Sequence, residues 1–367
     1  MIKTLRSFVC ACLGLIVLVS SSHGSEPSKT EKFSQIIQSY AQKNLFNGNV
    51  LVAQKGKVIY KKSIGQADME WGIANTADTK FRIGSVTKQF TALLIMRLKQ
   101  SGKLKLEDKI TTYLPWYRKD TGDQITIHQL LTHTAGIPNF TEDAKIMLDI
   151  ENSGYSVKEV AQKYCSRDLE FAPGSKFKYN NSDYYLLGVI IEAVTGKTYE
   201  QVLKEEIFDP IGMKDTGIDK PSILLKKRAT GYVFIEEKYY NAPFLDPEST
   251  TYAAGALYST VGDLYLWQKA LFSEKLLSKE NLKIMLTPFL GKYAYGLYVN
   301  KFKPKGMNEE VTVIGHNGGI PGFSASLIRY VEDDITVILM DNTTVHKRGN
   351  LENISLDIFR CLKDLPT

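Results

Sequence analysis

The chain has 367 residues, a formal net charge of +6 and a hydrophobic content of 43%. This length and apolar content allow one large globular domain with a substantial core. Lysine and arginine are interspersed with aspartate and glutamate, so the modest positive charge does not predict a nucleic-acid-binding protein.

The N-terminus has the pattern of an export signal. Lys3 and Arg6 precede an apolar stretch from Phe8 to Val19, and Ser22-His23-Gly24 follows with the small residues Ser22 and Gly24. This stretch is too short to span a bilayer by itself. We therefore expect residues 1–24 to be a signal peptide and residues 25–367 to form one domain that is periplasmic or secreted. An uncleaved membrane anchor is the alternative.

Two cysteines, Cys165 and Cys361, lie in the predicted mature chain. Two cysteines so far apart do not make a disulfide framework, even in an oxidising compartment. We expect two buried thiols, although a pairing between them stays open.

Helices and strands alternate with clear boundaries along the first hundred residues. Ser28 and Glu31 have the spacing of a capping box at the start of an amphipathic helix. A turn at Lys55-Gly56 predicts a hairpin. The expected elements are a helix over 31–44, strands over 49–53 and 58–63, and a helix that begins at Ser85 and ends near Gly102.

The middle of the chain is predicted to be mostly helical, and strands return near its end. Helices are expected over 126–132, 157–164, 182–194, 199–208 and 261–272, with Gly196 as a C-terminal cap. Strands are expected over 295–299, 311–314, 324–331 and 335–340, and a final helix over 351–362. The pattern predicts an α/β two-lobed fold, with one antiparallel sheet from both chain ends and a helical lobe over about 103–283. A cleft between two lobes is a natural site.

Ser85 and Lys88 stand one helical turn apart at the start of the longest apolar helical run of the mature chain. A serine needs a base to become a nucleophile, and a lysine at i+3 can reach it. The same spacing recurs at Ser175 and Lys178, but there it follows Pro173-Gly174 in a segment without helical periodicity. We expect Ser175 to be a loop residue.

Two further segments complete a possible acyl-transfer site. Tyr179 and Asn181 lie where a loop meets a helix, and His316 begins the only His-x-Gly of the chain. Ser85 would attack, while Lys88 and Tyr179 would share the proton transfers. Tyr179 would need the nearby charge of Lys88 to lower its pKa. The backbone N–H groups of Ser85 and Gly319 would hold the oxyanion, and no metal or cofactor is required.

On these motifs the chain resembles the serine β-lactamase and penicillin-binding protein superfamily, nearest the class C β-lactamases and the related DD-peptidases and esterases. The resemblance extends over about residues 35–345 and includes the segments 130–138, 172–174 and 253–260. It implies catalysis by Ser85, Lys88 and Tyr179, and substrate binding by Asn181, His316, Gly318 and Gly319. It also implies a serine hydrolase that cleaves amide, β-lactam or ester bonds of a small molecule or a D-amino-acid peptide.

His316 departs from the family pattern, because typical β-lactamases carry lysine at this position. Histidine there is similar to certain DD-peptidases, D-aminopeptidases and esterase-like members. If His316 must be positive to bind a substrate carboxylate, catalytic efficiency should rise as the pH falls through its pKa. A penicillin-binding sensor or binding module, with slow or no turnover, is the alternative function.

Other patterns carry less weight. His128 and His133 are five residues apart, which is the wrong spacing for two metal ligands on one helical face. We therefore expect His133 to be a buried structural histidine. The segments 139–155 and 234–252 are expected to be loops that select the substrate.

Overall fold

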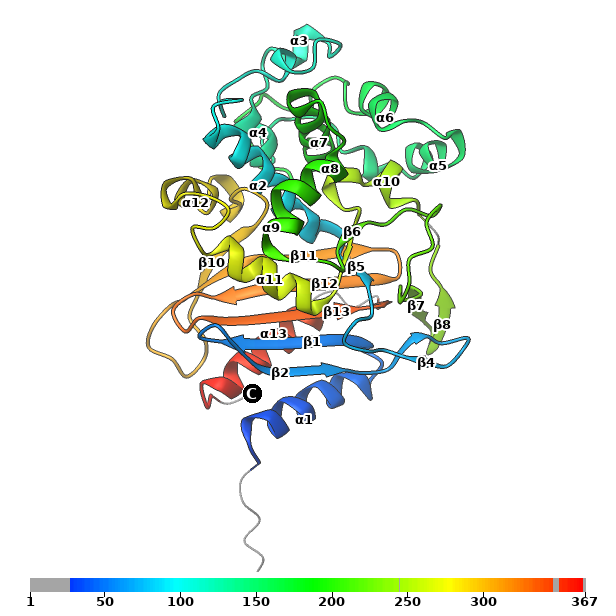
Figure 1. Ribbon diagram of the computed structural model, residues 1–367, viewed down its shortest axis with the longest axis vertical. Coiled ribbons are helices and arrows are strands. Elements are labelled where there is room, and N and C mark those ends of the chain that lie inside the picture. The colour runs from blue at the N-terminus through cyan, green and yellow to red at the C-terminus, as the bar shows by residue number, and fades with distance from the viewer. Residues whose placement is uncertain (1–26, 244, 346–349, 366–367) are drawn as a thin grey trace, which may run out of the picture.

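A computed structural model describes residues 27–243, 245–345 and 350–365. The predicted export signal, residues 1–24, lies outside the described residues. Strands from the two ends of the chain form one antiparallel sheet of order β10-β11-β12-β13-β1-β2, as the sequence predicted (Figure 1). Its strands are β1 (Gly48–Gln54), β2 (Lys57–Ser63), β10 (Tyr298–Phe302), β11 (Val311–Ile320), β12 (Phe323–Tyr330) and β13 (Ile335–Asp341).

Helices cover both faces of this sheet. Helices α1 (Lys29–Ala41) and α13 (Asn350–Leu362) pack on one face, and α11 (Val261–Leu271) packs on the other, against β1 and β13. Because strands β1 and β13 are buried on both sides, apolar residues follow one another through their middles, at 50–53 and 337–340, rather than alternating with polar ones. Helix α1 begins at the predicted capping box, in which Ser28 and Glu31 each bind the other's backbone N–H.

A second lobe of helices lies beyond the α11 face of the sheet (Figure 1). Its long members are α2 (Thr87–Gln100) and α7 (Asn181–Thr195). Helix α11 was predicted within this lobe but lies on the sheet. The remaining helices are α3 (Lys119–Gly122), α4 (Ile127–Leu131), α5 (Ala144–Ser153), α6 (Val157–Tyr164), α8 (Tyr199–Leu203), the π-helix η4 (Lys204–Phe208), α9 (Asp209–Ile211), α10 (Pro247–Thr250) and α12 (Lys279–Met285).

Short strands and 3₁₀ turns make up the remaining described elements. Strands β5 (Phe81–Arg82), β9 (Leu257–Ser259) and β6 (Gly217–Ile218) form one small sheet, which fixes the approach to Ser85. The other short elements are β3 (Gln66–Asp68), β4 (Ile73–Ala74), β7 (Tyr232–Ile235), β8 (Lys238–Asn241), β14 (Thr343–Val345), η1 (Gly84–Val86), η2 (Ile110–Thr112), η3 (Phe140–Glu142), η5 (Tyr252–Ala254) and η6 (Leu290–Lys292).

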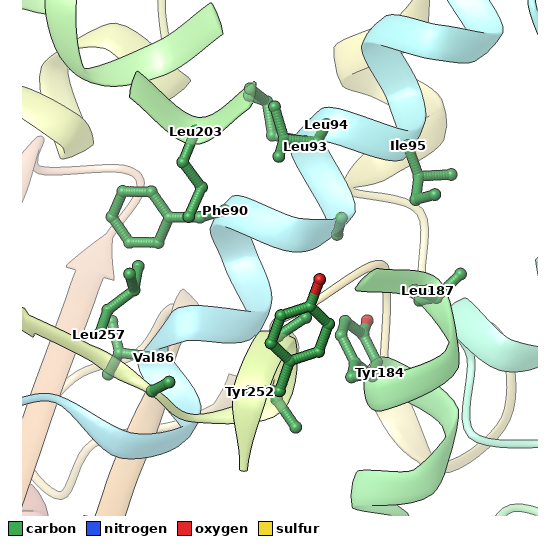
Figure 2. Packing of buried hydrophobic residues seen from close by; sticks show 14 of the residues in the cluster. Val86, Phe90, Leu93, Leu94, Ile95, Tyr184, Leu187, Leu203, Tyr252 and Leu257 are labelled. Atoms are coloured by element: carbon green, nitrogen blue, oxygen red, sulfur yellow. The ribbon is translucent and has the colours of Figure 1, made fainter. Parts of the chain in front are cut away.

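Helix α2 runs through the centre of the core. Phe90 stacks on Trp267 with ring centroids 4.0 Å apart, and Leu93, Leu94 and Ile95 are buried on different sides of the helix (Figure 2). Every residue of α2 from Thr87 to Met96 is buried, so this part of the helix lies in the interior of the protein. The packing of α2 therefore holds its N-terminus, and with it Ser85, in a fixed place between the lobes.

Four expectations about local structure were wrong. Residues 139–155 include helix α5, and residues 234–252 include strand β8, where Tyr239 pairs with Phe234 rather than lying in a polar loop. Strand β10 begins three residues later than predicted, and β11 continues through the glycines to Ile320. Glycine weakens a strand locally, but pairing with β12 from Val313 to Ile320 holds this part of β11 extended. Cys165 and Cys361 are both buried free thiols.

Candidate active site

Ser85 lies in the 3₁₀ turn η1, between β5 and α2, and the glycines of β11 press against this turn. A Cβ atom on Gly318 would lie 1.8 Å from the carbonyl oxygen of Ile83, so only glycine fits there. Gly84 has φ +48°, and a Cβ on it would lie 2.8 Å from the nitrogen of Gly319. The backbones of η1 and β11 thus meet directly beside Ser85.

Lys88 is fully buried and its amine points at Ser85. The amine nitrogen lies 3.2 Å from Ser85 Oγ, 2.7 Å from Asn181 Oδ1 and 2.9 Å from the carbonyl oxygen of Ala254. The two carbonyl oxygens are acceptors only, so they take two N–H bonds. Burial lowers the pKa of Lys88 well below its ordinary value, against a smaller opposing effect of Asp183. A neutral amine in this place directs its lone pair at the Ser85 hydroxyl.

Asn181 orients Lys88 from the first turn of α7. Asn180 caps this helix by accepting the N–H of Ser182, so Asn181 is free to face the site. The amide nitrogen of Asn181 donates to Thr141 Oγ1 at 2.8 Å, which turns its carbonyl oxygen toward Lys88. Sequence reasoning missed Thr141 and the carbonyl of Ala254, because no motif marks a residue that only the tertiary fold brings to the site.

Tyr179 faces the same centre. Lys88 Nζ lies 4.8 Å from its ring centroid, and its hydroxyl is buried with no hydrogen-bond partner among the described residues. Burial raises the pKa of Tyr179, and the nearby Ser85 hydroxyl offsets only part of this effect. The expected lowering of this pKa by Lys88 is therefore wrong for the free protein. A neutral phenol is a proton donor, which suits protonation of a leaving group.

Strand β11 offers a free backbone edge beside Ser85. The pairing of β10 with β11 ends at Gly315, whereas β11 continues to Ile320 and remains paired with β12 on its other side. From His316 onward, the edge of β11 that faces away from β12 has no strand partner in the described structure. Such an edge can bind an extended substrate through backbone groups.

His316 is a buried, neutral member of this strand. Its Nδ1 donates to the carbonyl oxygen of Asn317 at 2.5 Å, and its Nε2 lies 3.2 Å from the Tyr293 hydroxyl. Burial, and secondarily the charge of protonated Lys88, lower the pKa of His316 to about 3. This does not support the positively charged histidine considered from the sequence.

We accordingly expect His316 to give no pH-dependent preference for carboxylates. The ratio of kcat/KM for a carboxylate-bearing substrate to kcat/KM for its amide analogue should stay constant between about pH 5 and 8, because His316 remains neutral there. The ratio cancels the titration of Lys88, which affects both substrates. A rise of this ratio toward pH 5 in the wild type, lost in His316→Gln, would show that His316 becomes charged.

A buried polar cluster lies behind the site. His133, buried as predicted, accepts the backbone N–H of Asn180 at its Nδ1, 3.2 Å away, and the same nitrogen lies 3.1 Å from Asp183 Oδ2. Because Nδ1 accepts this N–H, it carries no hydrogen of its own. The hydrogen between Nδ1 and Asp183 Oδ2 must therefore belong to Asp183. Burial also raises the pKa of Asp183 well above its ordinary value, despite Lys88. Asp183 is thus a neutral acid that donates to His133.

Asp183→Asn should therefore be tolerated, because its amide can donate to His133 in place of the acid. We expect kcat/KM to change by less than about threefold and stability to change little. Asp183→Ala removes this donor and should cost about 1–3 kcal/mol in the free energy of unfolding. Denaturant titrations and kinetics of the two variants check this. A large loss of activity in Asp183→Asn with intact stability would instead indicate that Lys88 needs a charged carboxylate.

The twin motif takes no part in the site. Ser175 lies in a bend and donates to the carbonyl oxygen of Ala172 at 2.6 Å. Lys178 forms an ion pair with Glu170 at 2.8 Å. Among the described residues, no cluster of histidine, cysteine, aspartate and glutamate is arranged to hold a metal ion. Nor does any helix in those parts of the chain have the length and hydropathy of a membrane span.

The fold and this cluster together define a class of protein, the serine hydrolases in which a lysine adjoins the serine. Comparison with known proteins agrees. The family model described as Beta-lactamase matches residues 33–357. The chain belongs to the β-lactamase family, within the serine β-lactamase and penicillin-binding protein superfamily, and is a serine hydrolase.

Several relatives share most of the chain. It is 30% identical to the teichoic acid D-alanine hydrolase of Staphylococcus aureus, over 91% of this chain and 79% of the relative. It is 28% identical to penicillin-binding protein 4* of Bacillus subtilis, over 86% of this chain and 72% of the relative. The D-amino acid amidase of Ochrobactrum anthropi superposes with a TM-score of 0.78 at 24% identity, covering 92% of this chain and 99% of the amidase, which supports the fold.

Proposed function

We propose that Ser85 is the nucleophile and Lys88 the base of an acyl-enzyme mechanism. One observation carries the proposal: two carbonyl oxygens, of Asn181 and Ala254, occupy two N–H groups of a buried lysine whose third direction meets Ser85 Oγ at 3.2 Å. This is the geometry of an amine that accepts the serine proton.

The remaining groups suit the later steps. As Lys88 takes the proton of Ser85, Oγ bonds to the substrate carbonyl carbon, and the carbonyl oxygen becomes an anion. We propose that the N–H groups of Ser85 and Gly319 stabilise that anion. Tyr179 donates its proton to the departing oxygen or nitrogen and recovers one from Lys88. Water then releases the acyl group from Ser85 by the same proton transfers in reverse.

We infer that the substrate is an ester or amide of a D-amino acid. Two of the similar proteins named above, a D-alanine hydrolase and a D-amino acid amidase, support this class. The free edge of β11 can bind the amide groups of such a substrate. Neutral His316 gives no fixed positive charge for a carboxylate, so we expect β-lactams to be poorer substrates than uncharged D-amino-acid esters and amides.

Labelling with an activated fluorophosphonate, followed by peptide mapping, tests the nucleophile. We expect a single adduct on the peptide that contains Ser85. The hydrolysis of D-alanyl and L-alanyl ester pairs then tests the substrate class, with preference for the D form. An adduct that forms but never turns over on any ester, amide or β-lactam would favour the sensor instead.

We further propose that the enzyme acts outside the cytoplasm, since its N-terminal sequence has the pattern of an export signal. Mass measurement of the protein purified from an exporting host should show loss of about the first 24 residues. A full-length protein retained in the membrane fraction would support the uncleaved anchor.

A further inference from the structure

A cavity of about 550 Å³ opens from the candidate site into the layer between the sheet and α13. Tyr179 and His316 line one end of it. This volume is in the range of small-molecule sites. Its other walls come from the two outer strands and from the first turns of α13, and they include Tyr298, Tyr330, Glu352 and Leu356.

The strand register explains why this space is open. Directly paired residues of antiparallel strands point to the same face. Tyr298 pairs with Gly315, which pairs with Ile328, so the middle member of this row has no side chain. Farther along the sheet, Tyr330 stacks on Phe359 with centroids 4.3 Å apart and anchors α13 there. Helix α13 is thus anchored to the sheet at Tyr330. The space beside Gly315, between α13 and strands β10 and β11, is not filled by a side chain.

The cavity lies on the leaving-group side of the reaction. Tyr179, the proton donor to the leaving group, lines it, whereas Ser85 and Asn181 are absent from its walls. A group bonded to the atom that Tyr179 protonates would point into this space. The acyl group, bonded to Ser85, would not.

The chemistry of the walls selects the occupant. Aromatic and aliphatic side chains dominate them, and Asn300, Asn317 and Ser355 are small uncharged polar groups among them. Glu352, in the first turn of α13, accepts a hydrogen bond from Asn317 at 2.5 Å and adds a carboxylate to the wall of the cavity. Apolar groups gain free energy by leaving water for such a space, and a phosphate or carboxylate would meet a like charge.

We propose that this cavity binds an apolar leaving group, an alkyl or aromatic alcohol or amine, of the ester or amide substrate. The inference rests on the proposed acyl-enzyme function and adds the chemical class of the departing half. An apolar leaving group distinguishes this enzyme from a hydrolase that releases D-alanine from an anionic carrier.

A series of esters tests it. N-acetyl-D-alanyl esters of ethanol, butanol and hexanol keep one acyl group and nearly equal leaving-group reactivity. In the wild type, kcat/KM should rise roughly three- to fourfold for each added methylene group. Asn300→Trp fills the cavity from β10 and should remove this rise with chain length. Lys301→Trp, on the opposite face of the same strand, is the matched control and should behave like the wild type.

The outcomes are distinct. Equal kcat/KM across the series in the wild type, or a chain-length dependence that survives in Asn300→Trp, overturns the proposal while hydrolysis of the ethyl ester keeps the acyl-enzyme function. The D-alanyl ester of glycerol phosphate should react at least about tenfold more slowly than the butyl ester, and faster reaction would also overturn it. Absence of all ester hydrolysis overturns both.

Discussion

Replacing Ser85 by alanine should abolish hydrolysis, with a loss of about 10⁵–10⁶ in kcat, because no other described group occupies the nucleophile position. The substitution deletes one oxygen and leaves the packing of η1 unchanged, so thermal unfolding should match the wild type. Turnover of a D-alanyl ester and labelling by a fluorophosphonate measure the loss.

Ser175→Ala provides the matched control, since Ser175 shares the Ser-x-x-Lys pattern but lies in a bend away from the site. This variant should keep full activity and full labelling. Undiminished labelling of Ser85→Ala would refute the assignment of the nucleophile.

The second large effect is expected from Lys88→Met, which keeps an unbranched side chain one atom shorter but removes the base. General base catalysis contributes about 10²–10⁴ in rate, and a loss of this size should appear in kcat/KM. The carbonyl oxygens of Asn181 and Ala254 lose their donor, so stability is measured in parallel. Lys178→Met, the twin position in an exposed ion pair, should have no effect on activity.

The pH profile identifies the form of Lys88 that works. The base acts when it is deprotonated, so kcat/KM should rise with increasing pH through the pKa of Lys88 and then level off. Burial lowers this pKa, so the midpoint should lie well below 10.5. A midpoint near the ordinary lysine value, or activity in Lys88→Arg at neutral pH, would contradict the role of a neutral amine.

The two Ser-x-x-Lys motifs could be distinguished from the sequence alone. Helical periodicity after Ser85, and its absence after Ser175, predicted which lysine could approach its serine. The hairpin near residue 55, the terminal strands and their common sheet were predicted from the same kind of local pattern. These features follow from periods of 2 and 3.6 residues, which the sequence displays directly.

The environment of each side chain was not readable in the same way. The sequence left open a His316 that becomes charged as the pH falls, and it predicted a Tyr179 whose pKa is lowered by Lys88, because both expectations started from the pKa values of exposed groups. In the fold both side chains are desolvated, and burial favours their neutral forms. Burial depends on segments hundreds of residues apart, so no local pattern records it.

The sequence by itself determined the identity, order and local geometry of the candidate catalytic groups, since a serine, a lysine and a helix start are written within four residues. Only the tertiary structure decided that Thr141 and Ala254 orient the lysine, that His316 is neutral, and that a cavity opens behind Tyr179. All three features depend on how strands and helices pack. Gly315 leaves a space between Tyr298 and Ile328 only once β10, β11 and β12 are aligned.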